Sequence, residues 1–358
     1  MAQDIVATAA EAAGEEIPPL LVLDRVAAYL DAAGLGTGEL RVAPTGAGRS
    51  NFTFVVERGG ERFVLRRPPR PPYPPSAHDV AREARLQLAL APLGVRVPPV
   101  LAICEDESVL GVPFYVMGYV DGPVITDELP PPLDSDPDAR RALAFDLVET
   151  LVEIHAADVE APAVEAFRRR GSYLDRQLRR FSELWPLNKT RELPAVERVG
   201  ALLAERRPAP VEETVVHGDF RLGNMIVRPY EPRIAVAIDW EMGAIGDPRA
   251  DVGYLLATYT EPGGPLSLVG GSAATDAEGF PSKQELVERY AERTGRVVDG
   301  VEWFVAFALW KAAIFCEAIY GRYLRGELAA GDDRSAIFEA GVPLMAESAL
   351  VALETGTV

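Results

Sequence analysis

The chain has 358 residues, which suits about two compact domains of roughly 100 to 200 residues each. Its 54 acidic and 36 basic residues give a net charge of −18. Such a surface repels nucleic acid and anionic membranes, which excludes general nucleic-acid binding. Two cysteines without metal-ligand spacing and only three histidines argue against a metal site built from several Cys or His ligands.

Neither the N-terminal segment nor the most apolar segment of the chain has the pattern of a targeting or membrane-spanning sequence. Residues 1–18 are rich in Ala and Glu, lack the basic and apolar regions of a signal peptide, and are expected to be frayed. The most apolar segment, 301–320, contains Glu302, Lys311 and Glu317, which favours a buried helix over a membrane span. The sequence therefore predicts a cytoplasmic protein without a membrane segment, and it leaves the oligomeric state open.

The first elements predicted along the chain are a helix and a β-hairpin. Residues 21–34 have a helical pattern that ends at a glycine. Two strands follow, at 51–57 and 61–66, and the Gly-Gly pair between them is typical of a hairpin turn. Six prolines within 66–76 then predict an extended loop.

A second helix and two further strands complete the first part of the chain. The helix is expected to start at Ser76 or Asp79 and to end near Ala91. Its predicted apolar face consists of Val80, Ala84 and Leu88. The two strands lie within 97–122 and are broken at Gly111.

The second part of the chain is mainly helical. Helices are predicted at 141–157 and, within the Arg-rich segment 167–181, after Gly171, while 215–227 and 234–241 are expected to form a short β pair. Further helices run to the end of the chain, interrupted by a Gly-rich loop near 262–279. The pattern predicts a mixed α/β (α+β) protein with a small β-rich N-terminal lobe and a larger, mostly helical C-terminal lobe.

One stretch between strand-like segments, "VVHGDFRLGNMIV", carries a chemical pattern. Asp219 and Asn224 lie five residues apart, and Asp239 follows the next strand in "IDWE". Phosphoryl transfer from ATP needs a carboxylate that orients the attacking hydroxyl and oxygen ligands for Mg²⁺. The order of these residues matches the catalytic loop and the metal-binding aspartate of kinases, which polar turns alone would leave unexplained.

On these motifs the sequence resembles the aminoglycoside phosphotransferase superfamily of kinase-like enzymes. "HGDFRLGN" resembles the catalytic loop of that family, "IDWE" its metal segment and "GDPRADVGYL" the segment that follows. "SNFTF", "FVLRRPP", "PSAHDVAREARL" and "FYVMGYVDG" are most similar to the kinase domains of acyl-CoA dehydrogenase family members 10 and 11. The resemblance covers roughly residues 38–345.

This resemblance implies a protein-kinase-like fold of two lobes with ATP bound between them. It implies an N-terminal segment and helix over 1–37 and a nucleotide-binding N-lobe over 38–117. A hinge at 118–122 is expected to lead into a C-lobe over 123–358 that holds the catalytic loop and the acceptor pocket.

The resemblance also implies roles for residues of the C-lobe. Asp219 is the expected base or hydroxyl-orienting residue, and Asn224 and Asp239 are the expected ligands of Mg²⁺. His217 is expected to brace the loop by hydrogen bonding. Asp251 is expected to hold the backbone of the loop, with a helix N-cap as the alternative role.

The phosphate-binding residues of the N-lobe depart from the family pattern. "GAGRSN" lacks the third glycine of a phosphate-covering loop, so Ser50 and Asn51 are either phosphate donors or part of a simple hairpin turn. Arg66 occupies the position where many kinases have a phosphate-pairing Lys, and Glu83 is its expected partner. Arg and Lys are not interchangeable, and a surface ion pair is the alternative.

The segment "YVMGYVDG" resembles the hinge that receives adenine. Met117 is expected at the back of the pocket, and backbone groups of Gly118 and Val120 are expected to bond the adenine edge. An ordinary edge strand and linker is the alternative.

The acceptor implied by the resemblance is the hydroxyl of a hydroxyacyl-CoA or a related hydroxy acid. Two arginine clusters are candidates for the phosphates of CoA: Arg66, Arg67 and Arg70, and Arg168–Arg170 with Arg176, Arg179 and Arg180. For the second cluster, a solvated helix face is the alternative. His155 is expected to be a buried structural residue.

Two other functions stay open at this stage. An aminoglycoside or macrolide phosphotransferase would have an acidic acceptor pocket, whereas an enzyme acting on a CoA thioester would have an Arg-lined one. A catalytically weak nucleotide-binding module is the other possibility, because Arg66 and the glycine-poor loop depart from the kinase pattern.

Overall fold

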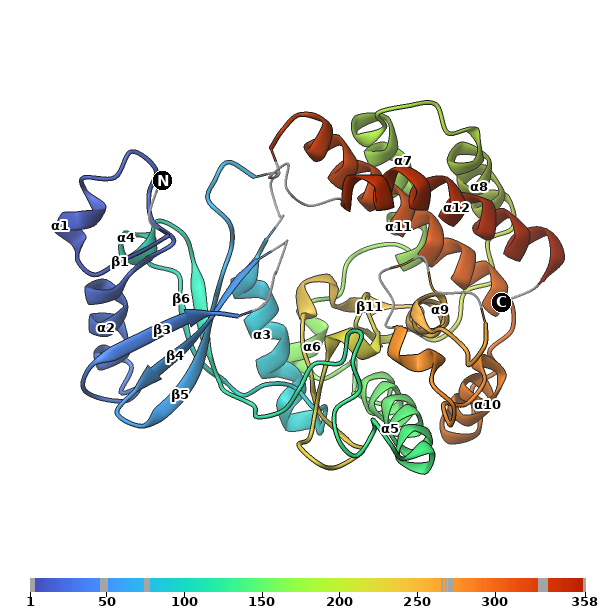
Figure 1. Cartoon of the computed structure of the whole chain (residues 1–358). Helices are drawn as coiled ribbons and strands as arrows, with labels where there is room; N and C mark the ends of the chain where they lie inside the picture. The colour runs from blue at the N-terminus through green and yellow to red at the C-terminus, as the bar shows by residue number, and fades with distance from the viewer. Residues whose placement is uncertain are drawn as a thin grey trace. The chain divides into compact units, whose positions relative to one another are not determined.

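The computed structural model describes residues 4–45, 51–73, 78–264, 267, 269, 273–327 and 334–356. The chain forms two compact units (Figure 1). Unit 1 comprises residues 1–93 and 97–120, and unit 2 comprises residues 94–96 and 121–358. Unit 1 contains a β-sheet and unit 2 is mostly helical, so the predicted mixed α/β class is confirmed.

The sheet of unit 1 has five antiparallel strands in the order β3-β4-β5-β7-β6. Their bounds are β3 Leu40–Pro44, β4 Phe52–Arg58, β5 Glu61–Arg67, β6 Val100–Cys104 and β7 Phe114–Gly118. The predicted hairpin is β4–β5, and Gly59 and Gly60 in its turn have φ values of 58° and 85°. Only glycine enters that region at little cost, which explains the Gly-Gly signal.

Side chains that alternate along the strands pack on opposite faces of this sheet. On one face, Phe54 and Leu65 share a buried cluster with Val26 of helix α2 (Leu23–Ala32). On the other, Tyr115 and Met117 pack with helix α3 (Val80–Leu90). Each face therefore has one helix, as the period of two residues in a strand requires.

Helix α3 corrects one part of the predicted apolar face. Asp79 caps the helix, since its Oδ1 accepts a hydrogen bond from the backbone N–H of Arg82. Leu88, however, is 47% exposed, while Leu86 and Leu90 are buried. The register of the helix against the sheet selects the buried leucines, and helical periodicity alone does not fix that register.

The N-terminal segment is ordered rather than frayed over its described residues. Strand β1 (Ile5–Val6) pairs in parallel with β2 (Leu21–Val22), and helix α1 (Ala9–Ala12) lies between them. Val6 joins the buried cluster beneath the sheet. Two-residue strands are too short to produce a periodic signal, so the sequence did not predict them. The same holds for the one-turn helix α4 (Glu107–Leu110), which ends at the predicted break.

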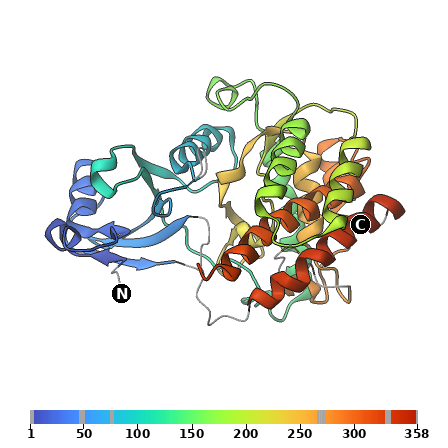
Figure 2. The same ribbon diagram turned by 90° about the horizontal axis from the view of Figure 1, so that it is seen from above.

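Unit 2 is built around helix α11 (Val301–Leu324), which contacts α7, α8, α9 and α12 (Figures 1 and 2). The bounds of the other helices are α5 Pro137–His155, α6 Pro162–Glu165, α7 Tyr173–Asn188, α8 Pro194–Glu205, α9 Arg249–Thr258, α10 Lys283–Thr294 and α12 Arg334–Thr355. Helix α11 is buried on nearly all sides, as its apolar sequence predicted.

Two of these helices are long and apolar enough to cross a membrane by length and composition alone. In α11, 78% of the most apolar window is buried within the chain, which is typical of a core helix. In the second helix, Ser335–Thr355, the buried share of that window is 28%.

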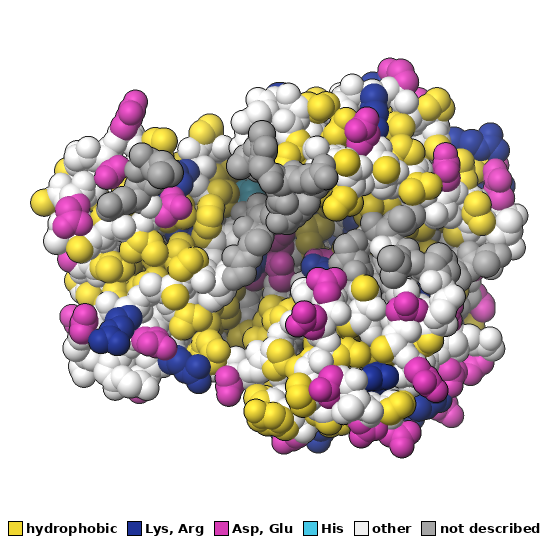
Figure 3. Space-filling model, viewed as in Figure 1, with side chains coloured by type: hydrophobic (Ala, Val, Ile, Leu, Met, Phe, Trp, Pro, Cys, Tyr) yellow, Lys and Arg dark blue, Asp and Glu magenta, His cyan; other side chains and the backbone are white. Residues whose placement is uncertain are grey.

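Ion pairs join α5 to α10 on the surface of unit 2. Arg141 pairs with Glu285 at 2.5 Å, and Arg289 pairs with Glu149 at 2.6 Å. Figure 3 shows acidic and basic side chains close together on the face that carries these two helices. The hydrogen bond from Arg141 and those from Ser282 hold the pKa of Glu285 at about 2. Where α5 and α10 meet, arginines thus neutralise part of the excess negative charge of the chain.

Four short strands of unit 2 carry the polar motifs. Strand β9 (Met225–Val227) pairs with β10 (Ile234–Ala237), so this part of the predicted β pair is confirmed. The preceding strand β8 (Thr214–Val216) pairs instead with β11 (Ala244–Gly246). The motif "HGDFRLGN" therefore connects two separate hairpin-like pairs.

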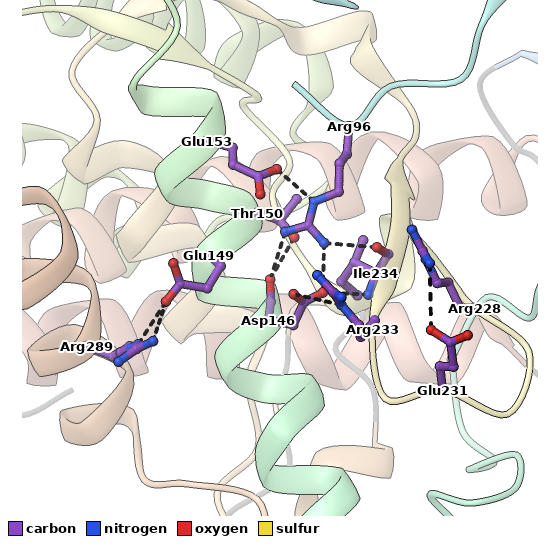
Figure 4. A network of polar contacts seen from close by, with 10 residues as sticks. All are labelled: Arg96, Asp146, Glu149, Thr150, Glu153, Arg228, Glu231, Arg233, Ile234 and Arg289. Carbon is purple, nitrogen blue, oxygen red and sulfur yellow. Dashed lines mark hydrogen bonds and ion pairs between the residues drawn. The ribbon is translucent and has the colours of Figure 1, made fainter. Parts of the chain in front are cut away.

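Arg96 fixes β10 to helix α5 (Figure 4). Its guanidinium pairs with Asp146 and Glu153, both at 2.7 Å, and donates to the carbonyl oxygen of Ile234 at 2.9 Å. Asp146 also accepts a hydrogen bond from the backbone N–H of Ile234, at 2.6 Å. The backbone N–H of Ala237 donates to the carbonyl oxygen of Arg96. These contacts hold the strand that ends just before Asp239.

Candidate active site

The catalytic-loop motif brings Asp219 and Asn224 into direct contact. Asn224 Nδ2 donates to the Oδ2 atom of Asp219 at 2.7 Å and to its backbone oxygen at 2.8 Å. Asp219 Oδ1 is buried and accepts no hydrogen bond from any described residue; Arg221 Nε lies 3.5 Å from it. One oxygen of this carboxylate is therefore fixed and the other has unused acceptor capacity.

The backbone around Asp219 permits no side chain at Gly218. That glycine has a φ of 84°, and an added Cβ would lie 2.8 Å from both the Cβ and the carbonyl oxygen of Met242. The turn thus depends on a residue that tolerates positive φ and close backbone approach.

The β9–β10 register places Asp239 beside Asn224. Met225 lies opposite Ala237, and the backbone N–H of Ile238 donates to the carbonyl oxygen of Asn224 at 2.9 Å. Asp239 itself has a φ of 68°, a conformation that costs a non-glycine residue about 1 kcal/mol or more. Such strain is typical of residues whose side-chain direction matters.

The donor chemistry at this end of the hairpin suits Mg²⁺. The amide N–H groups of Asn224 bond to Asp219, so its carbonyl oxygen is the atom suited to a metal, and Asp239 supplies a carboxylate. In the described part of the chain, no three His, Cys, Asp or Glu residues gather as a ligand set. A site with one carboxylate, one amide and the phosphates of a nucleotide fits Mg²⁺, whereas a protein-only zinc site does not.

Asp251 of α9 holds the backbone of the catalytic loop. Its carboxylate accepts hydrogen bonds from the backbone N–H of His217 at 2.6 Å and of Gly218 at 2.8 Å. Helix α9 is capped at Pro248, so the alternative role as N-cap is wrong. Burial opposes ionisation of Asp251, but hydrogen bonds from His155 and the loop outweigh it and lower the pKa of the carboxyl.

His217 links the loop to the segment that bears Asp239. Its Nε2 bonds the carbonyl oxygen of Ile238 at 3.0 Å, and its Nδ1 accepts from the backbone N–H of Asp219 at 3.3 Å. The ring packs against Trp240 with 4.7 Å between centroids. The side chain is fully buried, so its contacts are those of a brace.

His155 is buried, as predicted, and has a role that the sequence did not reveal. Its Nδ1 lies 2.7 Å from Tyr290 Oη, and its Nε2 lies 3.3 Å from Asp251 Oδ2. The residues that meet here come from α5, α9 and α10. No spacing in the sequence signals such a contact.

Tyr254 is a second residue that sequence reasoning missed. Burial first, and then the charge of Asp219, raise the pKa of its phenol. Tyr254 lies one helical turn after Asp251 on α9, so the helix that supports the loop also presents a phenol to Asp219. That i, i+3 spacing is the one signal that the sequence offered.

In unit 1, Arg66 is paired with Glu83, its predicted partner. Arg66 Nε lies 3.1 Å from Glu83 Oε2, and the two side chains are 12% and 1% exposed. The pair is therefore buried, and the alternative of a surface ion pair is wrong. Tyr115, which sequence reasoning missed, donates from its Oη to Glu83 Oε1 at 3.2 Å.

Of Ser50 and Asn51, the two residues predicted to contact the nucleotide phosphates, the structure describes only Asn51. Ser50 lies outside the described residues. Asn51 is 3% exposed, and its Oδ1 lies 3.1 Å from His78 Nδ1. Asn51 is thus tied to the segment that precedes α3.

The predicted hinge residues lie at the end of β7 and just beyond it. Met117 is buried against α3. The N–H of Gly118 donates to the carbonyl oxygen of Pro99 at 2.8 Å, so this N–H is already used within unit 1. Val120 is the last residue of unit 1.

The first arginine cluster does not form a joint anion site. Arg67 is buried and donates to the carbonyl oxygens of Leu20 and Pro68. Arg70 pairs with Asp4 at 2.6 Å. These guanidinium groups hold unit 1 together, so the prediction that this cluster binds CoA phosphates is wrong.

The second cluster contains a group of arginines that we call the basic patch: Arg169, Arg170, Arg179 and Arg180. All four are exposed, and none forms an ion pair with a described residue. Arg168 differs from them because it pairs with Glu160 and Glu165. Partial burial of the guanidinium, and then the charge of Arg169, lower the pKa of Arg180.

Sequence comparison relates the chain to one enzyme family. The profile of the phosphotransferase enzyme family matches residues 41–286. The chain is 33% identical over 294 residues to mouse acyl-CoA dehydrogenase family member 10, covering 81% of this chain and 27% of that protein. It is 31% identical over 314 residues to human family member 11, covering 87% of this chain and 40% of that protein. The chain thus spans well under half the length of these curated relatives.

Solved structures share the fold. A Ralstonia eutropha protein, provisionally assigned as an aminoglycoside phosphotransferase, has 28% identity and a TM-score of 0.75, covering 92% of this chain and 98% of that one. Spectinomycin phosphotransferase in complex with ADP and spectinomycin has a TM-score of 0.60 with the same coverage, and at 11% identity it shows the fold alone. The predicted family and the kinase-like fold are thereby confirmed. The chain belongs to the phosphotransferase enzyme family.

Proposed function

We propose that this chain is an ATP- and Mg²⁺-dependent small-molecule kinase whose acceptor is a hydroxyacyl-CoA or a related hydroxy acid. One observation carries the proposal: Asn224 fixes one carboxylate oxygen of Asp219, and the other is buried without a hydrogen-bond donor. A buried acceptor atom without a donor is costly unless a ligand completes it. The hydroxyl of an acceptor supplies that donor.

The proposed reaction is an in-line transfer. The acceptor hydroxyl donates its hydrogen bond to Asp219 Oδ1, which orients the hydroxyl oxygen toward the γ-phosphorus. A bond forms between these two atoms, the bond from the phosphorus to the leaving oxygen of ADP breaks, and the hydroxyl proton passes to Asp219 and then to solvent. Mg²⁺, when held by Asn224 and Asp239, neutralises charge on the phosphates.

The nucleotide-binding role of unit 1 rests on the buried Arg66–Glu83 pair. In kinases a cation paired with a glutamate contacts the nucleotide phosphates. Arg66 offers a planar guanidinium, which recognises phosphate in a bidentate manner. The ADP bound to spectinomycin phosphotransferase, which shares this fold, supports ATP as the phosphoryl donor.

The basic patch supports an acceptor that carries phosphates. In a chain of net charge −18, four exposed arginines without ion pairs form a local site for an anion such as CoA. The relatives named as acyl-CoA dehydrogenase family members agree with this class. An aminoglycoside is a polycation, which the same patch would repel.

The test is Mg²⁺-dependent ADP release from ATP across an acceptor panel. The panel contains 3- and 4-hydroxyacyl-CoAs, the free hydroxy acids, an aminoglycoside, a macrolide and choline. Turnover of a hydroxyacyl-CoA that is abolished by Asp219→Asn supports the proposal. The exposed Asp127→Asn exchange in the same unit is the matched control and should retain activity. Turnover of the antibiotic alone overturns the acceptor class, and absence of ATP binding overturns the kinase.

A further inference from the structure

One of the three lysines in the chain, Lys311, lies in the middle of α11 and is 5% exposed. Its Nζ lies 5.1 Å from the ring centroid of Phe307, 5.4 Å from that of Phe181 and 6.0 Å from that of Tyr254. Within the described residues, its ammonium group forms no hydrogen bond or ion pair. Lys311 is thus a nearly buried cation surrounded by aromatic rings.

This arrangement is energetically incomplete. An ammonium group that is transferred from water into the protein without an anionic partner loses hydration free energy. Cation–π contacts with aromatic rings compensate only part of that loss. Burial lowers the pKa of Lys311 to about 8, while the carboxylates of Asp251 and Asp219 favour the charged form without contacting it. At neutral pH the group is therefore still mainly protonated and presents donors that no protein atom accepts.

The surroundings of Lys311 connect it to the candidate active site. Tyr254, whose phenol is subject to the charge of Asp219, is one of the rings around the ammonium group. Phe181 comes from α7, which lies against α11 (Figures 1 and 2). The neighbouring Arg180 belongs to the basic patch and acts electrostatically on Lys311.

Helix α7 contributes a second unsatisfied polar atom. The Oε1 atom of Gln177 is buried and accepts no hydrogen bond from the described residues. Gln177 precedes Phe181 by one helical turn. Helix α7 therefore also carries a buried acceptor that the described residues do not use, which a polar ligand could complete.

We propose that Lys311 binds the acyl oxygen of the acceptor, which is the carboxylate of a hydroxy acid or the thioester carbonyl of a hydroxyacyl-CoA. The inference rests on the proposed function, because it assumes that the acceptor hydroxyl occupies Asp219. Lys311 then donates to the acyl oxygen, and the aromatic rings contact the carbons between the two polar groups.

The first arm of the test is a KM measurement with Lys311→Met. We expect KM for both the free hydroxy acid and its CoA thioester to rise about 10- to 100-fold, the loss expected for one charge-assisted hydrogen bond. KM for ATP should stay unchanged. The matched control is Lys189→Met, because Lys189 is more exposed and pairs with Glu192 on the surface.

A second variant separates the acyl oxygen from the phosphates of CoA. The double exchange Arg169→Ala and Arg180→Ala should raise KM for the thioester only. If Lys311→Met instead raises KM for the thioester alone, Lys311 serves the CoA moiety and the inference is overturned.

The second arm is binding without turnover. Calorimetry with AMP-PNP and Mg²⁺ measures 4-hydroxypentanoate and its CoA thioester on the intact chain and on Lys311→Met. Binding that weakens in the variant supports the inference even if no phosphoryl transfer occurs, in which case the proposed function fails by itself. Unchanged binding and KM in Lys311→Met overturn the inference and leave the function intact. If the intact chain binds neither ligand, both fail.

Discussion

Two aspartates of unit 2, Asp219 within the catalytic loop and Asp251 beside it, have opposite environments. Both carboxylate oxygens of Asp251 accept backbone hydrogen bonds from the loop, and His155 adds a third contact. Asp219 has one oxygen bonded by Asn224 and one without a hydrogen bond. Protein groups thus donate hydrogen bonds to both carboxylate oxygens of Asp251, whereas Oδ1 of Asp219 can still accept a hydrogen bond from a ligand.

The difference assigns a structural role to Asp251 and a chemical role to Asp219. A buried carboxylate with all its acceptors satisfied contributes rigidity, because removing it leaves several donors unpaired. A carboxylate with an unused acceptor is positioned by the same network and is available to a substrate. Exchanges at Asp219 and at Asp251 should therefore have different effects on activity and on stability.

The largest effect is expected from Asp219→Asn. Loss of a general base or hydroxyl-orienting carboxylate lowers kcat by about 100- to 10,000-fold. The thermal midpoint should hardly change, because the protein itself does not satisfy Oδ1. Steady-state kinetics and a melting curve measure the two quantities. A variant that unfolds at much lower temperature would contradict the distinction from Asp251.

Asp251→Asn is expected to reduce stability as well as activity. The amide replaces one acceptor by a donor that faces the backbone N–H groups of the loop, at a cost of about 3 to 5 kcal/mol in unfolding free energy. Urea denaturation with an unchanged m-value measures it. An active variant of native stability would show that the loop does not depend on Asp251.

The Arg96 network provides a smaller test of how β10 is held. Asp146→Ala leaves the guanidinium of Arg96 and the backbone N–H of Ile234 without their shared acceptor. We expect a loss of about 2 to 3 kcal/mol in unfolding free energy and a lower kcat. The control is Arg289→Ala, which removes a partly exposed ion pair and should cost less than about 1 kcal/mol.

Lys311→Met should have a smaller effect of opposite sign, a gain in stability. Lowering the pKa of Lys311 from 10.5 to about 8 corresponds to about 3 kcal/mol of unfavourable charge burial, from which lost cation–π contacts subtract about 1. The net gain expected at pH 7 is about 2 kcal/mol. Denaturation of both proteins at pH 7 measures it.

The gain at Lys311 should depend on pH in a defined direction. Below its folded pKa the lysine is charged in both states, and the folded state bears the full penalty. As pH rises from about 8 toward 10.5, the folded state releases its proton before the unfolded state does, so the intact chain is stabilised. The charged groups that act on it are Asp251, Asp219 and Arg180. The advantage of Lys311→Met should therefore shrink over this range, and a constant advantage would contradict it.

Local signals in the sequence predicted a large share of the fold. The β4–β5 hairpin follows from alternation and from two glycines, and α3 follows from its cap at Asp79. The order of Asp219, Asn224 and Asp239 predicted a kinase-like site because each residue stands beside a strand-like segment. The two-residue strands β1 and β2 and the exposure of Leu88 escaped prediction, since they depend on packing over a distance.

The chain by itself determined which residue types are available and in what order, and with them the family and the reaction type. Tertiary structure decided which polar side chains have their hydrogen-bond or ion-pair partners within the protein. Sequence spacing does not reveal that His155 contacts Asp251 or that three aromatic rings surround Lys311. These contacts join helices that are far apart in the sequence. A polar group without a hydrogen-bond partner costs free energy only once the fold has excluded water from it. For that reason the unused acceptor of Asp219 and the unpaired ammonium of Lys311 emerge only in the folded chain.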